Sequence, residues 1–436
     1  MVQEIGSSPP ELEAVWAKYG LKESPYSTSP MRLLSILPIQ NVFSGRSEEV
    51  SLMKKMIRSK NSTRNLVVGA FGVGKTTFTN YIKWSLAIKN KEASNYLVTN
   101  TEVKVQPNWD AVSFLFSTLS AIYNSSIIFS WESKGINTNS IKKLKDYVEI
   151  TRLKNIQGSI AGFGAGYGES QGNPPSISPE ILEKLLVDVC TELLNQGKQL
   201  IISYDNLENI ETEKLSELFR SIRDYLQIEG LHTIFMGSSS VISALEANGQ
   251  VHSVFSRPII LQPLSEKDVI EILEKRCESL KFENGNYIRP YNEKTVKTLY
   301  LKLNKNIRFT FKVLEDATIH SEKFAPCEIT MNEIIAVQEQ EKKEILSALT
   351  ETQLKIISAL LERLELTVTD LSSATEIGIT NITTPIKELS DKGLVVSYKD
   401  TEDKRIKYIR LSDNSYLRLY FDTKDANKEI QKELFK

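Results

Sequence analysis

Short apolar runs, each bounded by polar or turn-forming residues, recur along the first 265 residues of the chain. Their β-branched content predicts buried strands. These runs lie at residues 65–68, 96–105, 200–208, 231–236 and 254–265. Residues 110–123 and 178–197 instead repeat apolar positions at helical spacing, so helices are expected there. The first half of the chain therefore alternates strands with helices.

The pattern changes after residue 265. Ser265 and Asp268 fit a helix-capping box that precedes an amphipathic stretch. Farther on, helical periodicity returns three times, and two short strands follow around a polar turn. These elements lie at residues 350–364, 369–375, 380–393, 394–398 and 406–411. Helix, helix, turn, helix and β-hairpin is the order of a winged helix-turn-helix, which we expect over residues 346–415.

Three segments do not fit these patterns. Residues 1–40 are rich in Ser and Pro, and we expect them to form a strap packed on the first domain. Residues 155–175 are rich in glycine, which is typical of a mobile loop or hairpin and could also be an insertion that contacts a partner or DNA. Residues 416–436 carry lysines at a spacing of four and predict a C-terminal helix.

Composition sets limits on the possible functions. A chain of 436 residues is too long for one compact core, so we expect two to four domains. The formal net charge of −1 means that any nucleic-acid surface must be local. Three scattered cysteines argue against a disulfide framework. We see no apolar run that approaches 18 residues, so we expect a cytoplasmic protein without a membrane partner.

One stretch carries clear chemistry. Residues 65–77 read as a strand, a glycine-rich turn and a helix start, and they fit the pattern G-x-x-x-x-G-K-[ST]. In such a loop, backbone N–H groups and the helix N-terminus cradle phosphates, Lys75 reaches the β- and γ-phosphates, and the Thr76 hydroxyl binds Mg²⁺. We therefore expect ATP and Mg²⁺ as ligands. The residues expected to contact the nucleotide are Gly69, Ala70, Phe71, Gly72, Val73, Gly74, Lys75, Thr76 and Thr77.

A second apolar strand ends in an acid, Asp205, which suits the role of holding the metal. Asn206 occupies the position where a base-like Glu is usual, and Glu208 stands three residues beyond Asp205. Asn can orient a water molecule but cannot accept its proton, so we expect slow ATP hydrolysis or a switch driven mainly by binding. The alternative is that Asp205 only ends a buried strand.

Two further residues are candidates with equally simple alternatives. Ser238 follows the strand at residues 231–236 and could face the γ-phosphate, or it could belong to a Ser-rich turn. Arg257 could reach the phosphate of a neighbouring subunit, or it could be a surface arginine.

Together with the Gly45-Arg46 pair, the motifs quoted above resemble the AAA+ and STAND superfamilies of phosphate-loop ATPases over residues 41–262. The resemblance implies a parallel α/β sheet with helices on both faces and the nucleotide at the strand ends. It also implies that Gly45 and Arg46 lie near the nucleotide. A helical lid is implied over residues 263–345, with Arg308 above the phosphates.

The winged helix resembles those of bacterial and archaeal transcription regulators. Its last helix and its wing would then contact the major groove and the backbone of double-stranded DNA. The residues expected to do so are Asn381, Thr383, Thr384, Lys387, Lys399, Lys404, Arg405 and Lys407. Residues 346–436 hold 14 Lys/Arg against 15 Asp/Glu, so the region is not basic overall. Pro385 lies early in the last helix and is expected to shift its start to Thr383 or Thr384.

These features lead to three hypotheses. The first is an ATP-dependent, DNA-binding switch in replication initiation or transcription regulation, because ATPase, lid and winged helix in this order resemble archaeal origin-recognition initiators. The second is a STAND-type signalling or defence ATPase whose winged helix docks a protein. A motor-like remodeller is disfavoured by Asn206. A homo-oligomer or a protein partner is possible under either of the first two.

Overall fold

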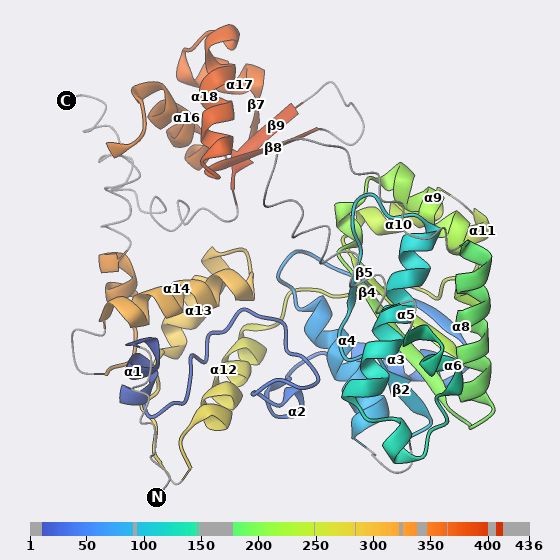
Figure 1. Cartoon of the computed structure of the whole chain (residues 1–436). Helices are drawn as coiled ribbons and strands as arrows, with labels where there is room; N and C mark the ends of the chain where they lie inside the picture. Colours follow the sequence, from blue (N-terminus) through green and yellow to red (C-terminus); the bar gives the residue numbers. More distant parts are fainter. Residues whose placement is uncertain are drawn as a thin grey trace, which may run out of the picture. The chain divides into compact units, whose positions relative to one another are not determined.

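Figure 1 shows the computed structural model of the chain. It describes residues 11–89, 94–145, 148, 178–247, 249–283, 285–321, 326–337, 347–363, 365–399 and 407–412. The chain divides into two compact units. The first contains residues 29–268, and the second contains residues 11–28 together with the chain from residue 269 onward.

The unit of residues 29–268 is built on a parallel sheet in the strand order β2-β4-β5-β1-β6, with β3 paired to β4. Its central strands are buried on both faces, which explains their continuous apolar runs. The strands are β1 (Thr63–Val68), β2 (Tyr96–Val98), β3 (Val103–Lys104), β4 (Gln199–Asp205), β5 (Leu231–Gly237) and β6 (Ile259–Ile260). The expected parallel α/β fold is confirmed.

The strand order matters for function because β5 lies between β1 and β4. Val68, the last residue of β1, is in register with Gly237 at the end of β5, and Tyr204 of β4 is in register with Phe235. Parallel strands end at the same edge of a sheet. The segments that follow β1, β4 and β5 therefore start side by side.

Helices cover both faces of this sheet, as Figure 1 shows. On one face Phe114, Leu186 and Phe219 pack with the strands, and on the other Met53 and Phe78 do so. The helices are α2 (Ile39–Val42), α3 (Ser47–Arg58), α4 (Lys75–Lys83), η1 (Trp84–Ile88), α5 (Ala111–Ile128), η2 (Glu132–Lys134), α6 (Asn139–Lys142), α8 (Pro179–Leu194), η3 (Leu207–Asn209), α9 (Thr212–Ile222), η4 (Tyr225–Gln227), α10 (Ser240–Glu246) and α11 (Gly249–His252).

Helix α5 corrects one expectation from the sequence. It is 18 residues long with a mean hydropathy of 1.4, so by length and composition alone it could span a membrane. Its serines and threonines hide this from a search for unbroken apolar runs. The core helix of a soluble protein passes the same test, and α5 buries Phe114, Leu115 and Ile122 in the core beside the sheet.

The second unit contains a bundle of α12 (Glu266–Leu280), α13 (Glu293–Lys302) and α14 (Ile307–His320), together with α1 (Glu11–Lys18). We expected the leader to pack on the ATPase domain, but its residues 11–28 pack here. Trp16 and Tyr26 are buried, and the Tyr26 hydroxyl donates to the Pro290 carbonyl at 2.8 Å. A ring contact with α14 explains this docking, since the ring centroids of Tyr26 and Phe311 lie 6.2 Å apart.

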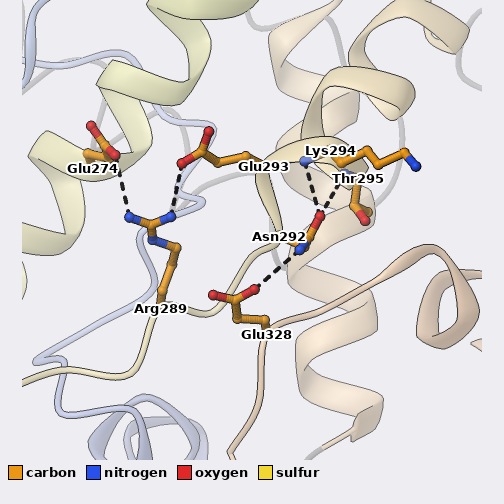
Figure 2. A network of polar contacts seen from close by, with 7 residues as sticks. All are labelled: Glu274, Arg289, Asn292, Glu293, Lys294, Thr295 and Glu328. Carbon is orange, nitrogen blue, oxygen red and sulfur yellow. Dashed lines mark hydrogen bonds and ion pairs between the residues drawn. The ribbon is translucent and has the colours of Figure 1, made fainter.

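A polar network ties the start of α13 to neighbouring segments (Figure 2). Asn292 caps the helix by accepting from the N–H groups of Lys294 and Thr295 at 3.1 and 3.3 Å, and its amide donates to Glu328. Arg289 bridges Glu274 of α12 and Glu293 of α13. These contacts hold α12 and α13 together, and their exposure makes each ion pair a small contribution to stability.

The winged helix-turn-helix is confirmed. It comprises α16 (Glu351–Glu362), β7 (Glu365–Thr367), α17 (Val368–Thr375), α18 (Ile379–Asp391), β8 (Val395–Lys399) and β9 (Lys407–Leu411). Leu360, Leu371, Ile382 and Leu389 form its core. The strands pair antiparallel in the order β7-β9-β8, and β7 is an addition to the hairpin expected from the sequence. The glycine-rich segment 155–175 and the tail 416–436 lie outside the described residues.

Candidate functional site

The glycine-rich loop joins the end of β1 to the start of α4. Gly72 and Gly74 have φ angles of +81° and +97°, which residues with side chains rarely adopt. At Gly69, a Cβ atom would stand 2.8 Å from Val73 Cγ1 and 2.9 Å from the Leu261 carbonyl oxygen. The loop can follow its tight path only because these positions lack side chains.

Two side chains at the start of α4 point to the chemistry expected of the loop. Lys75 is 8% exposed, and its ammonium donates to the carbonyls of Gly69 and Ala70 at 2.9 and 3.4 Å. Thr76 donates its hydroxyl to Asp205 Oδ2 at 2.7 Å. Hydroxyl and carboxylate oxygens are the donors that Mg²⁺ prefers, so the Thr76–Asp205 pair fits this ion.

The residues after Asp205 turn sharply. Asn206 has a φ of +68°, and its N–H donates to Asp205 Oδ1 at 2.9 Å. The backbone of Asn206 thus orients the carboxylate. Glu208 follows on η3, and its Oε2 lies 3.4 Å from the place that a Cβ on Gly237 would occupy. The carboxylate of Glu208 therefore stands at the tip of β5, beside the phosphate loop, since Gly69 N–H donates to the Gly237 carbonyl.

Ser238 follows at the same tip, with its hydroxyl 2.7 Å from that of Ser240. Arg46 supports the loop from behind. Its guanidinium donates to the carbonyls of Val73 and Gln262 at 2.8 and 2.9 Å. A Cβ on the neighbouring Gly45 would lie 3.0 Å from the Asp268 carboxyl carbon. The Gly-Arg pair thus braces the loop and the start of α12.

Arg257 is not brought to this cluster, and Arg308 belongs to the other unit. Arg257 is exposed and precedes β6, whose residue Ile259 is in register with Val67 of β1. Arg257 therefore lies toward the amino ends of the strands. Arg308 is half-buried in the first turn of α14, which belongs to the other unit. Its N–H donates to the N-cap residue Asn306 at 3.1 Å.

Sequence patterns did not reveal a buried cation two turns along α4. Lys83 is 0% exposed, and its ammonium donates to the carbonyl and hydroxyl of Thr99 at 3.2 and 3.1 Å. Burial lowers the pKa of Lys83 to about 7, and the charge of Glu102 opposes this shift. One feature of the sequence could have indicated this: Lys83 lies on the same face of α4 as Thr76 and Thr79, which are also buried.

The recognition helix of the winged domain is α18. Ile382, Ile386 and Leu389 face the core, so Asn381, Thr383, Thr384 and Lys387 lie on the exposed side. The helix begins at Ile379 and continues through Pro385, so the expected later start is wrong. Core contacts on both sides of the proline outweigh its lost N–H. Lys407 is exposed at the start of β9. The side chain of Lys399, and Lys404 and Arg405 entirely, lie outside the description.

Comparison with known proteins gives two family matches. Residues 46–310 match the family model described as KAP family P-loop domain, and residues 349–407 match the MarR family. These matches confirm the expected pairing of a P-loop ATPase with a C-terminal winged helix. No curated protein matches the chain.

Solved structures similar to the chain include three archaeal proteins. The Aeropyrum pernix ORC2 protein in ADPNP and ADP complexes has 14% identity and a TM-score of 0.48, over 94% of this chain and 96% of that one. The Aeropyrum pernix ORC1 protein in complex with DNA has 15% identity and a TM-score of 0.45, over 90% and 95%. Cdc6p from Pyrobaculum aerophilum has 14% identity and a TM-score of 0.44, over 93% and 98%.

Proposed function

Because the chain belongs to the KAP family of P-loop NTPases, we propose that it is an ATP-dependent switch that binds double-stranded DNA through its C-terminal winged helix. The observation that carries the nucleotide half is the 2.7 Å hydrogen bond between Thr76 and Asp205. It joins the loop helix to β4 across the intervening strand β5. Both expected metal-binding oxygens therefore lie together.

Each residue of the cluster has a role in binding Mg-ATP. The N–H groups of residues 69–77 bind the phosphates, with the N-terminus of α4 adding partial positive charge. Lys75 exchanges its carbonyl partners for the β- and γ-phosphates. Thr76 and Asp205 would hold Mg²⁺, which would neutralise phosphate charge. Arg46 and Gly45 keep the loop and the start of α12 in place.

Hydrolysis is the slower part of the proposed cycle. Glu208 is a carboxylate at the tip of β5 and can accept a proton from water, whereas the carboxamide of Asn206 cannot. We assign to Ser238, whose hydroxyl lies 2.7 Å from that of Ser240 at the same strand tip, the role of a hydroxyl that orients the γ-phosphate. A base that reaches the site from an exposed turn, not from the strand end itself, suits slow turnover and a long-lived ATP state.

The DNA half rests on α18 and the MarR match. Asn381, Thr383, Thr384 and Lys387 present amide, hydroxyl and ammonium groups from one exposed helix face, as base and phosphate readout requires. Wing residues Lys399, Lys404, Arg405 and Lys407 add phosphate contacts. Arg308 is assigned to sense the γ-phosphate from the lid, so that ATP and ADP favour different arrangements of the chain. If the protein forms homo-oligomers, Arg257 contacts the phosphate bound by a neighbouring subunit.

We assign this cytoplasmic switch to replication initiation or transcription regulation. A second candidate is a STAND-type signalling or defence ATPase whose winged helix docks a protein. It is favoured by one observation, the near balance of 14 basic and 15 acidic residues over residues 346–436. A DNA-binding domain usually carries a basic excess.

The test measures retention of a labelled double-stranded DNA by the full-length protein with ATP, ADP or no nucleotide. Lys75→Ala removes the phosphate contact, and Lys60→Ala is the matched control on an exposed residue. We expect DNA affinity to differ between ATP and ADP in the wild type and in the control, and not in Lys75→Ala. Equal affinity in all three nucleotide states would refute the switch.

A variant in the winged helix separates the two candidates. Lys387→Ala should weaken DNA binding and lower its dependence on salt concentration by about one unit of log-log slope. If the wild type shows no salt-dependent DNA binding at all, the protein-docking candidate replaces the first.

A further inference from the structure

The strap that precedes the phosphate-loop domain is held at two points only a few residues apart. Its residues 11–28 belong to the unit that also contains the chain from residue 269 onward, here called the lid unit. Residues 29–268 form the other unit, here called the ATPase unit. The last residues of the first part and the first residues of the second part are each fastened by buried side chains. These two anchors are described in turn, each within its own unit.

The first anchor is Arg276 on α12. Its Nη1 donates to the backbone carbonyls of Pro25 and Ser27 at 2.9 and 2.7 Å. The guanidinium lies 4.9 Å from the ring centroid of Phe311, and the residue is 8% exposed. Between the two carbonyls, the fully buried Tyr26 bonds to Pro290. A planar charged fork held against a ring and two carbonyls fixes this end of the strap to the lid helices.

The second anchor is Met31, which is bonded to the phosphate-loop helix through both of its backbone groups. Its carbonyl accepts from the Asn80 amide at 2.9 Å, and its N–H donates to the Thr77 hydroxyl at 3.4 Å. Asn80 is 1% exposed. Thr77 directly follows Thr76, the proposed magnesium ligand. This end of the strap is therefore attached to the first turns of α4, beneath the nucleotide site.

Only Thr28, Ser29 and Pro30 separate the two anchors. Four backbone steps from Ser27 to Met31 can span at most about 14 Å. This limit holds whatever the arrangement of the two units. The other covalent connection is α12 itself, whose first residues up to Asp268 belong to the ATPase unit and are capped by the Ser265–Asp268 hydrogen bonds.

Arg276 lies eight residues beyond Asp268 on the same helix, a distance of about 12 Å along its axis. Turning α12 by about 20° around its start would move Arg276 by roughly 4 Å, because the displacement scales with the length of the arm. A link of three residues limits such a movement to the reach that remains before the link is fully extended.

We propose that residues 25–31 are a tether that couples movement of the lid helices to the phosphate-loop helix α4, with Arg276 and Asn80 as its positioning residues. This inference rests on the proposed nucleotide switch and adds the path by which the site and the lid communicate. Movement of the lid helices displaces Met31, which is bonded to Thr77 and Asn80. The tether therefore shifts the helix that carries Lys75 and Thr76.

The test lengthens the tether without removing either anchor. Six Gly/Ser residues are inserted between Thr28 and Ser29, which adds about 20 Å of reach. The control carries the same insertion between Lys134 and Gly135, in an exposed turn of the ATPase unit. Arg276→Gln serves as a second variant, because it releases one anchor at unchanged linker length. ATP affinity is measured in each protein to confirm an intact site.

The readout is the distance distribution between two spin labels in the full-length protein. One label is on the exposed Cys327, whose backbone is held by Tyr19, and the other is on Glu213→Cys in α9. Burial raises the pKa of the Cys190 and Cys277 thiols to about 12, so neither is labelled at neutral pH.

We expect the tether insertion and Arg276→Gln to broaden the distribution without nucleotide and to abolish its shift between ATP analogue and ADP. The control insertion should do neither. Unchanged distributions in the tether variant would overturn the proposal, and so would a broadened distribution that keeps the full nucleotide shift. If the wild type shows no nucleotide shift but the insertion still broadens the distribution, the tether stands as a link and the nucleotide switch fails.

Discussion

Replacing Lys83 by Met gives a quantitative test of how the phosphate-loop helix is packed. Lys83 is 0% exposed, and its ammonium is bonded to Thr99. Burial lowers its pKa from 10.5 to about 7, so the unfolded chain holds this proton over a pH range in which the folded protein has lost it. Stability must therefore rise with pH between these two values.

The size of the effect follows from the shift. The buried lysine costs about 4 kcal/mol of unfolding free energy at pH 7 and about 2 kcal/mol at pH 9, and the cost vanishes above pH 10.5. Met has a similar length and no charge, so Lys83→Met removes this dependence while filling the space. The stability of the wild type relative to Lys83→Met should thus increase by about 2 kcal/mol from pH 7 to pH 9.

The assay is urea denaturation of both proteins at several pH values, following the transition of the ATPase unit. Taking the difference between the two proteins cancels the titrating groups that do not interact with Lys83. The exposed Lys60→Met is the matched control and should show a flat difference. A flat difference for Lys83→Met as well would show that Lys83 keeps its charge in the folded protein. The account of this residue as a buried, weakly basic amine would then be refuted.

Three further predictions concern separate parts of the molecule. Gly69→Ala forces a Cβ into the loop and should lower ATP affinity at least about tenfold in a binding titration, whereas Gly249→Ala, with open space around it, should not. Glu208→Gln should slow ATP turnover by about 100-fold or more with ATP affinity retained. The control Glu213→Gln, at an exposed residue, should have no such effect. Turnover by Glu208→Gln at the wild-type rate would show that Glu208 is not the base. Leu389→Ala leaves a cavity in the core of the winged helix and should lower the unfolding free energy of this domain by about 2–5 kcal/mol, with loss of DNA binding. Thermal denaturation measures the change. An unchanged melting temperature would contradict the placement of Leu389 in the core.

Local patterns along the chain were sufficient for the elements and for the phosphate loop. A strand, a run of glycines and a Lys-Thr helix start are contiguous, so residues 69–76 could be recognised before any tertiary contact was known. The winged helix was equally readable, because capped helices and a hairpin are short-range features. The third strand of its sheet, β7, was missed, since three residues are too few to show a period.

Contacts between distant parts of the chain decided the rest, because hydrogen-bonding partners and burial depend on how the elements pack. The sequence alone could name Asp205 and Glu208, but only the strand order β4-β5-β1 brings them to the loop. Packing likewise made Lys83 a buried amine, although its residue type suggests a surface position. The leader was expected on the first domain, yet Tyr26 is buried and packs against Phe311 of α14. The sequence by itself thus determined which elements form and which loop carries the phosphate-binding pattern, and tertiary packing determined which side chains meet around that loop.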